Sequence, residues 1–218
     1  MKIKGSVTKQ EAELEISKSE IELLGKIVPR AIRELGGIFG DKVALWRHNN
    51  AIDNLKIANK KIKESGLPIK EVPMKILYPL LENSSLEEEK DVREKWANLL
   101  ANAITQSHPV KPNYAEILKE LSPLEVRILD QLYNEASKEN NYKTRKSLQF
   151  STEAMSKSVN ISPKEADLIV DNFHRLNLCR QPAGDGIKVG EFKFSLSTNE
   201  IFEFTTLGYD FVEACRWN

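Results

Sequence analysis

The sequence has little cysteine, little histidine and no excess charge, and each shortage excludes a class of protein. Two cysteines, Cys179 and Cys215, are too few for a disulfide framework, and no paired-cysteine zinc motif is present. The three histidines have no partner at the spacing of a metal-binding motif. The 32 basic and 32 acidic residues leave a net charge of zero. Binding to nucleic acid or membrane would therefore need a local patch.

Long apolar runs are absent as well. No stretch approaches the length of a membrane-spanning helix, and the first twenty residues lack the apolar core of a signal peptide. We therefore expect a cytoplasmic protein with two free thiols and no membrane association. The 218 residues are enough for one large or two small domains with a sizeable core.

Helical periodicity dominates the first part of the chain. Residues 9–39 predict a helix that ends at a glycine cluster, and Asp41 can cap a second helix running to about Ser65. Two helices joined by such a turn predict an antiparallel hairpin within one chain, or the seam of a homodimer. The apolar face of the first helix consists of Leu24, Val28, Ala31, Leu35 and Ile38.

Capping signals divide the middle of the chain into short helices. A connector at 66–73 precedes a helix at 74–83, and Ser85 with Glu88 predicts a capping box that opens the next helix. The apolar stripe of that helix comprises Trp96, Leu99, Leu100 and Ala103. A loop at 108–112 and a short helix at 114–121 follow. Ser122-Pro123-Leu124-Glu125 is then a strong helix start.

The last seventy residues change in character. A polar stretch at 137–147 suggests a domain boundary or long loop, and helices are predicted at 152–158 and after Ser162. Strands at 177–179, 191–197 and 200–206, a Gly-rich loop at 181–190 and a closing helix complete the chain. This order is typical of a winged helix-turn-helix. We therefore expect a mainly α protein, with a helical domain at 1–137 and a winged-helix-like α+β module at 138–218.

Signals of enzymatic chemistry are weak. The sequence has no nucleophile elbow, phosphate-binding loop or dinucleotide fingerprint, so we expect no catalytic residue, cofactor or metal. Asn98 and Asn102 lie four residues apart on one helix ridge, and His108 lies in the following loop. These three residues are candidates for a ligand or loop site. A role in packing a helical scaffold explains them more simply.

A winged helix raises the hypothesis of DNA binding through its second helix. The basic residues available for phosphate contacts are Lys143, Arg145, Lys146, Lys157, Lys164, Arg175, Arg180, Lys188 and Lys193. The helix that would read bases also carries Glu165, Asp167 and Asp171, and such acids repel the DNA backbone. A winged helix that serves protein contacts or packing is at least as well supported as one that reads DNA.

The stretch from Trp96 to Glu125 resembles the core signature of the Abi-alpha family of bacterial phage-defence proteins. The elements of the resemblance are an apolar LLA helix, a His-Pro loop, an aromatic residue opening a helix, and the motif LSPLE. The resemblance covers residues 70–135 well. Residues 110–113 intervene here between the His-Pro pair and Tyr114, where the family pattern places the aromatic sooner. The resemblance carries over no catalytic residue.

The resemblance implies a phage-defence, or abortive-infection, protein that is not an enzyme. We expect it to act by binding a macromolecule, with a protein partner and a homodimer through the N-terminal helices as hypotheses. One alternative is a DNA-binding transcriptional regulator that uses the C-terminal winged helix. Another is a toxin or enzyme with its site near the His108 loop.

Overall fold

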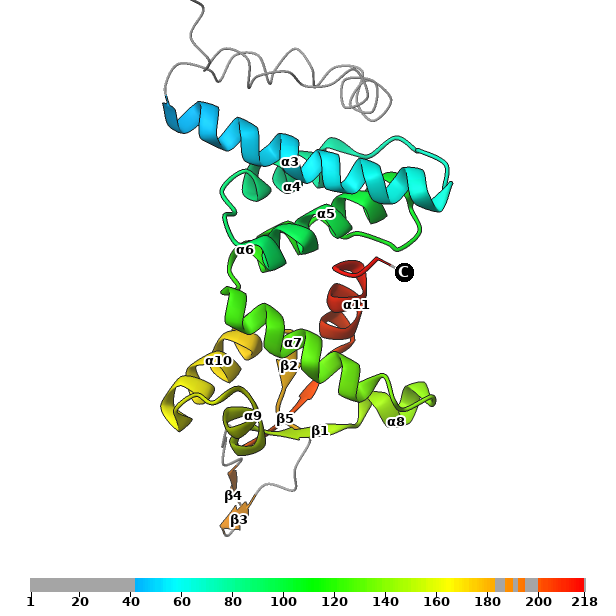
Figure 1. Cartoon of the computed structure of the whole chain (residues 1–218). Helices are drawn as coiled ribbons and strands as arrows, with labels where there is room; N and C mark the ends of the chain where they lie inside the picture. The colour runs from blue at the N-terminus through cyan, green and yellow to red at the C-terminus, as the bar shows by residue number, and fades with distance from the viewer. Residues whose placement is uncertain (1–41, 183–186, 190–191, 195–199, 218) are drawn as a thin grey trace, which may run out of the picture. The chain divides into compact units, whose positions relative to one another are not determined.

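The chain is mainly helical, with a small three-stranded antiparallel sheet near its C-terminal end (Figure 1). The computed structural model describes residues 42–182, 187–189, 192–194 and 200–217. The helix predicted at 9–39 lies outside these residues. The described residues up to Lys119 form a first unit, and Glu120–Arg216 form a second unit. The independent domains predicted on either side of residue 137 stay a prediction.

The first unit consists of four helices. They are α3 (Lys42–Ser65), α4 (Met74–Ser84), α5 (Lys90–Thr105) and α6 (Tyr114–Lys119). α5 packs against α3 and α4, and α4 also packs against α6. The core between them is made of fully buried aliphatic side chains, among them Leu55, Leu77, Leu99 and Ile104. The helices predicted to end near Ser65 and to span 74–83 are confirmed.

The start of α5 corrects one sequence prediction. The capping box of Ser85 and Glu88 does not form, because α5 begins at Lys90 with Glu89 as its N-cap. Ser85 is instead the C-cap of α4, and its hydroxyl donates to the carbonyl of Glu82. Ser85, which was predicted to cap the start of α5, therefore caps the end of α4.

The second unit contains a three-stranded sheet with the strand order β1–β5–β2. Its elements are α7 (Pro123–Ala136), α8 (Tyr142–Lys146), β1 (Gln149–Ser151), α9 (Thr152–Val159), α10 (Pro163–Arg175), β2 (Cys179–Arg180), β3 (Ile187–Val189), β4 (Phe192–Phe194), β5 (Ile201–Phe204) and α11 (Thr206–Ala214). β5 pairs antiparallel with both β1 and β2, while β3 and β4 form a separate hairpin. The predicted helices at 152–158 and after Ser162 are confirmed.

Aromatic side chains pack around the central strand β5. Phe202 and Phe204 are fully buried, and each ring centroid lies 5.8 Å from that of Phe150 on β1. Tyr209 on α11 adds a contact at 4.7 Å to the ring of Phe204. β1 was not predicted from the sequence, and the residues that form β3 were predicted to lie in a loop. The polar stretch at 137–147 also contains the short helix α8, which Asn141 caps.

Candidate functional site

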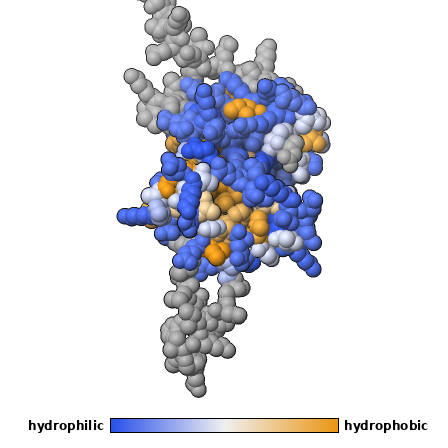
Figure 2. Space-filling view, turned by 60° about the horizontal axis from the view of Figure 1, so that its bottom comes forward, coloured by the Kyte–Doolittle hydropathy of each residue, from blue (hydrophilic) through white to orange (hydrophobic). Residues whose placement is uncertain are grey.

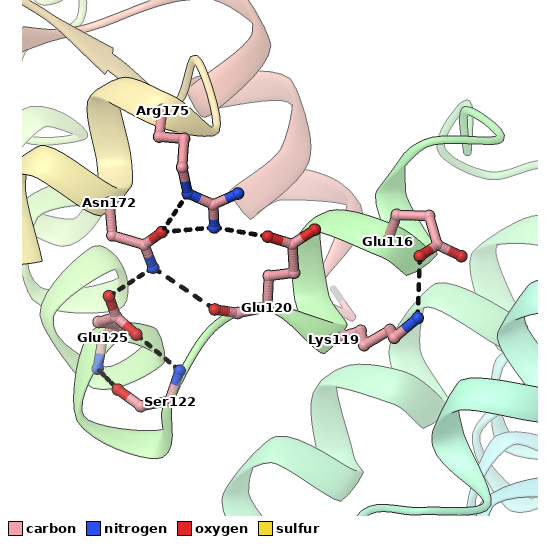
Figure 3. A network of polar contacts seen from close by, with 7 residues as sticks. All are labelled: Glu116, Lys119, Glu120, Ser122, Glu125, Asn172 and Arg175. Carbon is pink, nitrogen blue, oxygen red and sulfur yellow. Dashed lines mark hydrogen bonds and ion pairs between the residues drawn. The ribbon is translucent and has the colours of Figure 1, made fainter.

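A polar network ties the start of α7 to the outer side of α10 (Figure 3). Ser122 caps α7: its hydroxyl accepts from the backbone N–H of Glu125, and the Glu125 carboxylate accepts from the backbone N–H of Ser122 at 2.7 Å. The other oxygen of Glu125 accepts from the side chain of Asn172 on α10, also at 2.7 Å. The helix start predicted at Ser122 is confirmed, and the capping box that forms there also anchors a second helix.

The same network holds an arginine. The Arg175 guanidinium donates to the side-chain oxygen of Asn172 at 2.7 Å and lies 2.5 Å from a carboxylate oxygen of Glu120. Asn172 therefore accepts from Arg175 while it donates to Glu125, and the chain of contacts extends from α10 to the segment before α7 (Figure 3). Glu125 is buried and its carboxylate has lost hydrogen bonds to water. The hydrogen bonds from Ser122 and Asn172 compensate for that loss.

Several other basic candidates for DNA contact are held by neighbouring groups. Arg180 on β2 donates at 2.7 Å to Glu203, its register partner on β5, and Lys157 lies 2.6 Å from Glu153 on α9. The hydrogen bond from Lys157 lowers the pKa of Glu153. These pairs satisfy carboxylates of the protein itself. A phosphate would have to compete with those carboxylates for Arg180 and Lys157.

The basic residues around α8 are placed differently. Lys143 is exposed, while the guanidinium of Arg145 donates twice to the carbonyl of Glu139, at 3.0 and 3.1 Å. Lys146 lies on α8, and Lys188 and Lys193 are register partners on β3 and β4. Lys164 is exposed in the first turn of α10. The structure thus distributes the nine candidates over α8, α9, α10, β2 and the β3–β4 hairpin of the second unit.

The candidate ligand residues of the first unit belong to its packing. Asn98 and Asn102 are buried on α5, and the side-chain oxygen of Asn102 accepts from the hydroxyl of Ser107 at 2.8 Å. The backbone N–H of Gln106, which takes the left-handed conformation as the C-cap of α5, donates to the carbonyl of Asn102. Asn102 therefore organises the turn that ends α5. His108 lies in the loop that follows and is half-buried.

Sequence reasoning missed a second group of buried asparagines. Asn50 and Asn54 on α3 donate to the carbonyls of Ser85 and Ser84, at 3.1 and 3.0 Å. These carbonyls lie at the C-terminal end of α4, where the helix cannot supply its own donors. The spacing of four residues between the two asparagines was the available signal, since it places both side chains on one face of α3.

Burial shifts the pKa values of three side chains in the second unit, Cys179, Tyr209 and His174. Burial raises the pKa of the Cys179 thiol, so that this cysteine is protonated and unreactive at neutral pH. Burial also raises the pKa of Tyr209, to about 12, and its hydroxyl donates to the carbonyl of Arg145 at 2.6 Å. Burial lowers the pKa of His174, and nearby Asp171 acts against that shift. Each of these environments is accounted for by packing.

The chain matches the family model described as abortive infection alpha over residues 47–215. Because the match extends through both units, the protein belongs to the abortive infection alpha family. Membership in this family suggests a role in phage defence. No curated protein and no solved structure matches the chain. Among the described helices, none is both long enough and apolar enough to cross a membrane.

Proposed function

We propose that this chain is a phage-defence protein that acts by binding a macromolecule and not by catalysis. The observation that carries the proposal is the family match, which includes the LSPLE motif of residues 121–125. The structure supports a binding role because that motif works as a helix cap and as an anchor for α10. Its residues are used to hold elements in place, as in a scaffold.

We further propose that the second unit is a winged-helix-like module. Its helices and strands follow one another in the order helix, helix, strand, helix, helix, strand, hairpin, strand, helix, and the central strand of its sheet is the last one in sequence. In this interpretation α10 is the helix that would be presented to a partner, and the β3–β4 hairpin is the wing. Fold analogy does not name the partner, so the surface of α10 must decide between protein and DNA.

A DNA-binding regulator is the alternative that this element order favours. Against it, Arg175, Arg180 and Lys157 are paired with carboxylates, and α10 carries three acidic residues of its own. Arginine, asparagine or glutamine side chains directed at base edges are what a DNA reader needs. A protein partner is therefore the better-supported choice. The homodimer through the N-terminal helices also remains a proposal, which sedimentation velocity of the full chain tests.

The experiment that tests the defence role is a phage challenge. Bacterial cells that express the full chain should show reduced plating of at least one phage from a diverse panel, compared with cells that carry the empty vector. The matched control is a chain in which packing is disrupted by Gly208→Ala. Unchanged plating of every phage in the panel by well-expressed wild-type protein would contradict the proposal.

A toxin or enzyme with its site at the His108 loop makes a different prediction. In that case His108→Ala should abolish protection while the melting temperature stays nearly constant. We expect the opposite, namely that the variant still protects, because Asn102 and Gln106 beside this loop serve the end of α5. Plating and thermal melting of the same variant separate the two cases.

A further inference from the structure

The outward side of α4 carries a row of exposed side chains. Met74, Tyr78 and Glu82 are exposed and follow one another at every fourth position, so they lie along one ridge of the helix. The helical turn that follows α4 continues this ridge to Leu86, which is also exposed. We call these four residues the α4 row. The opposite side of the helix packs against α3, α5 and α6.

The α4 row is mostly apolar. The exposed fractions are 42% for Met74, 53% for Tyr78 and 49% for Leu86, and these are three of the six exposed large apolar side chains that the structure describes. Exposed apolar residues are ordinary, and Figure 2 shows several on one face of the molecule among mostly hydrophilic neighbours. The α4 row differs because its apolar side chains stand on one ridge, where a single partner can cover them together.

The two ends of the α4 row have opposite charge. At the end near Met74 the exposed charged residues are Lys70, Glu71 and Lys75. At the end near Leu86 the carboxylates are those of Glu82, Glu87, Glu88 and Glu89, and the adjacent Lys90 and Asp91 cancel each other.

Two guanidiniums offset part of the acidic charge near Leu86. Arg47 donates to the hydroxyl of Ser85, and Arg93 donates to the carbonyl of Glu87. Four carboxylates against two guanidiniums leave a net charge of minus two at this end. Two lysines against one glutamate leave plus one at the other end. The row therefore has a positive and a negative end with an apolar middle.

A row with unlike ends is complementary to an inverted copy of itself. A two-fold axis perpendicular to α4, at the level of Leu80, makes the helices of two copies antiparallel. Met74 and Leu86 are each six residues from Leu80, so Met74 of one copy lies opposite Leu86 of the other. Lys75 then comes within one helical turn of Glu82 of the second copy.

We propose that the α4 row is a homodimer interface, in which α4 of two copies packs antiparallel about a two-fold axis. The occupant is a second copy because the row matches itself in both charge and apolar residues. The inference goes beyond the proposed function and does not depend on it. The interface is also separate from a seam through the helix predicted at 9–39. A helix of eleven residues gives a small contact, so the dimer should form reversibly at micromolar concentrations.

Sedimentation velocity of the full chain over a concentration series tests the interface. We expect the wild type to shift from monomer to dimer as its concentration rises. Met74→Glu should remain monomeric, because it places a carboxylate against the acidic end of the second copy. Lys63→Glu, at an exposed position on α3, is the matched control and should dimerise as the wild type does. Thermal melting of both variants checks that they fold.

A charge exchange tests the antiparallel arrangement. Lys75→Glu and Glu82→Lys should each raise the dissociation constant of the dimer by roughly tenfold, since a favourable charge contact becomes repulsive in both symmetric positions. An equimolar mixture of the two variants should associate as tightly as the wild type. In that heterodimer one pair is native and the other is exchanged, so both pairs are attractive.

Three results would overturn the inference. The wild type could stay monomeric throughout the series, as expected if residues of the same chain cover the row. Met74→Glu could dimerise as well as the wild type, which would locate the dimer on another surface. The mixture of Lys75→Glu and Glu82→Lys could associate no better than either variant alone, which would exclude the antiparallel pairing.

Discussion

Glu125 shows how one buried carboxylate can serve two helices. One of its oxygens completes the capping box at the start of α7, and the other accepts from Asn172 on α10. Removing the carboxylate leaves the backbone N–H of Ser122 and the side chain of Asn172 without this acceptor. The importance of Glu125 is therefore greater than that of an ordinary cap residue.

We predict that Glu125→Ala lowers the free energy of unfolding by roughly 2 to 3 kcal/mol, since a cap and a buried hydrogen bond are lost together. Ser122→Ala should cost about 1 kcal/mol, because it removes only the cap. Arg127→Ala, an exposed position on the same helix, is the control and should change stability by less than about 0.5 kcal/mol. Urea unfolding measures all three. Equal losses for Glu125→Ala and Arg127→Ala would contradict the assignment.

Tyr209 predicts how stability depends on alkaline pH. Burial raises its pKa to about 12 in the folded chain, whereas the unfolded chain has an ordinary tyrosine pKa near about 10. The unfolded state thus loses the phenol proton first, and stability falls as the pH rises from about 10 towards 12. Tyr209→Phe should lack this part of the decline, although it loses about 1 kcal/mol at neutral pH with the hydrogen bond to Arg145.

Chemical unfolding of both chains at pH 8 and pH 10.5 measures the effect. The difference in stability between the wild type and Tyr209→Phe should shrink at the higher pH. A constant difference at both pH values would show that the phenol does not have a raised pKa.

At the scale of whole elements, the ends of helices determine how each unit is organised. The end of α4 is capped by two asparagines of α3, and the connector before α4 donates from Lys70 to the carbonyl of Ile104 at the end of α5. In the second unit, Thr205 caps α11 and also donates to the carbonyl of Leu178. Polar groups at helix termini are thus satisfied by neighbouring elements.

Gly208 marks the closest approach between elements. A Cβ atom at this position would lie 2.0 Å from the carbonyl oxygen of Leu178, which is backbone and cannot rotate away. We therefore predict that Gly208→Ala lowers the free energy of unfolding by about 3 kcal/mol or more, through overpacking between α11 and the start of β2. Thermal melting of Gly208→Ala beside the exposed-site control Glu135→Ala tests this. A stable Gly208→Ala variant would contradict the close packing.

Local signals explain which elements could be predicted from the sequence. Ser122 and Ser162 cap helices as expected, since a cap needs only residues within one turn. Ser85 does not cap α5 because its contacts come from α3, distant along the chain, and from the last turn of α4. β1 has three residues and exists through pairing with β5, some fifty residues later, so no short window of sequence reveals it.

The candidate site was predictable only in part, for the same reason. The acidic character of α10 is visible in the sequence, because Glu165, Asp167 and Asp171 are neighbours there. The pairing of Arg175 with Glu120 and of Arg180 with Glu203 is not visible, since it depends on folding. A count of basic residues after position 140 ignores these ion pairs. It therefore overstates the positive charge that is available to bind a nucleic acid.

At the scale of the whole molecule, the balance of charge bears on whether the protein binds DNA or another protein. The chain has no net charge. In the described second unit, Lys157, Arg175 and Arg180 form ion pairs with carboxylates of the same unit. The helix that a DNA-binding module would insert into a groove carries three acidic residues, Glu165, Asp167 and Asp171. These features favour the proposal that the protein recognises another protein.

Binding of the purified full chain to duplex DNA of random sequence, followed by fluorescence anisotropy across a salt series, tests this central claim most directly. The account predicts no saturable binding at micromolar protein, even at low salt, and no change with Arg175→Glu or Lys143→Glu. Tight binding that weakens steeply with salt, and weakens further in those two variants, would contradict it, because that slope reports phosphates neutralised by basic side chains.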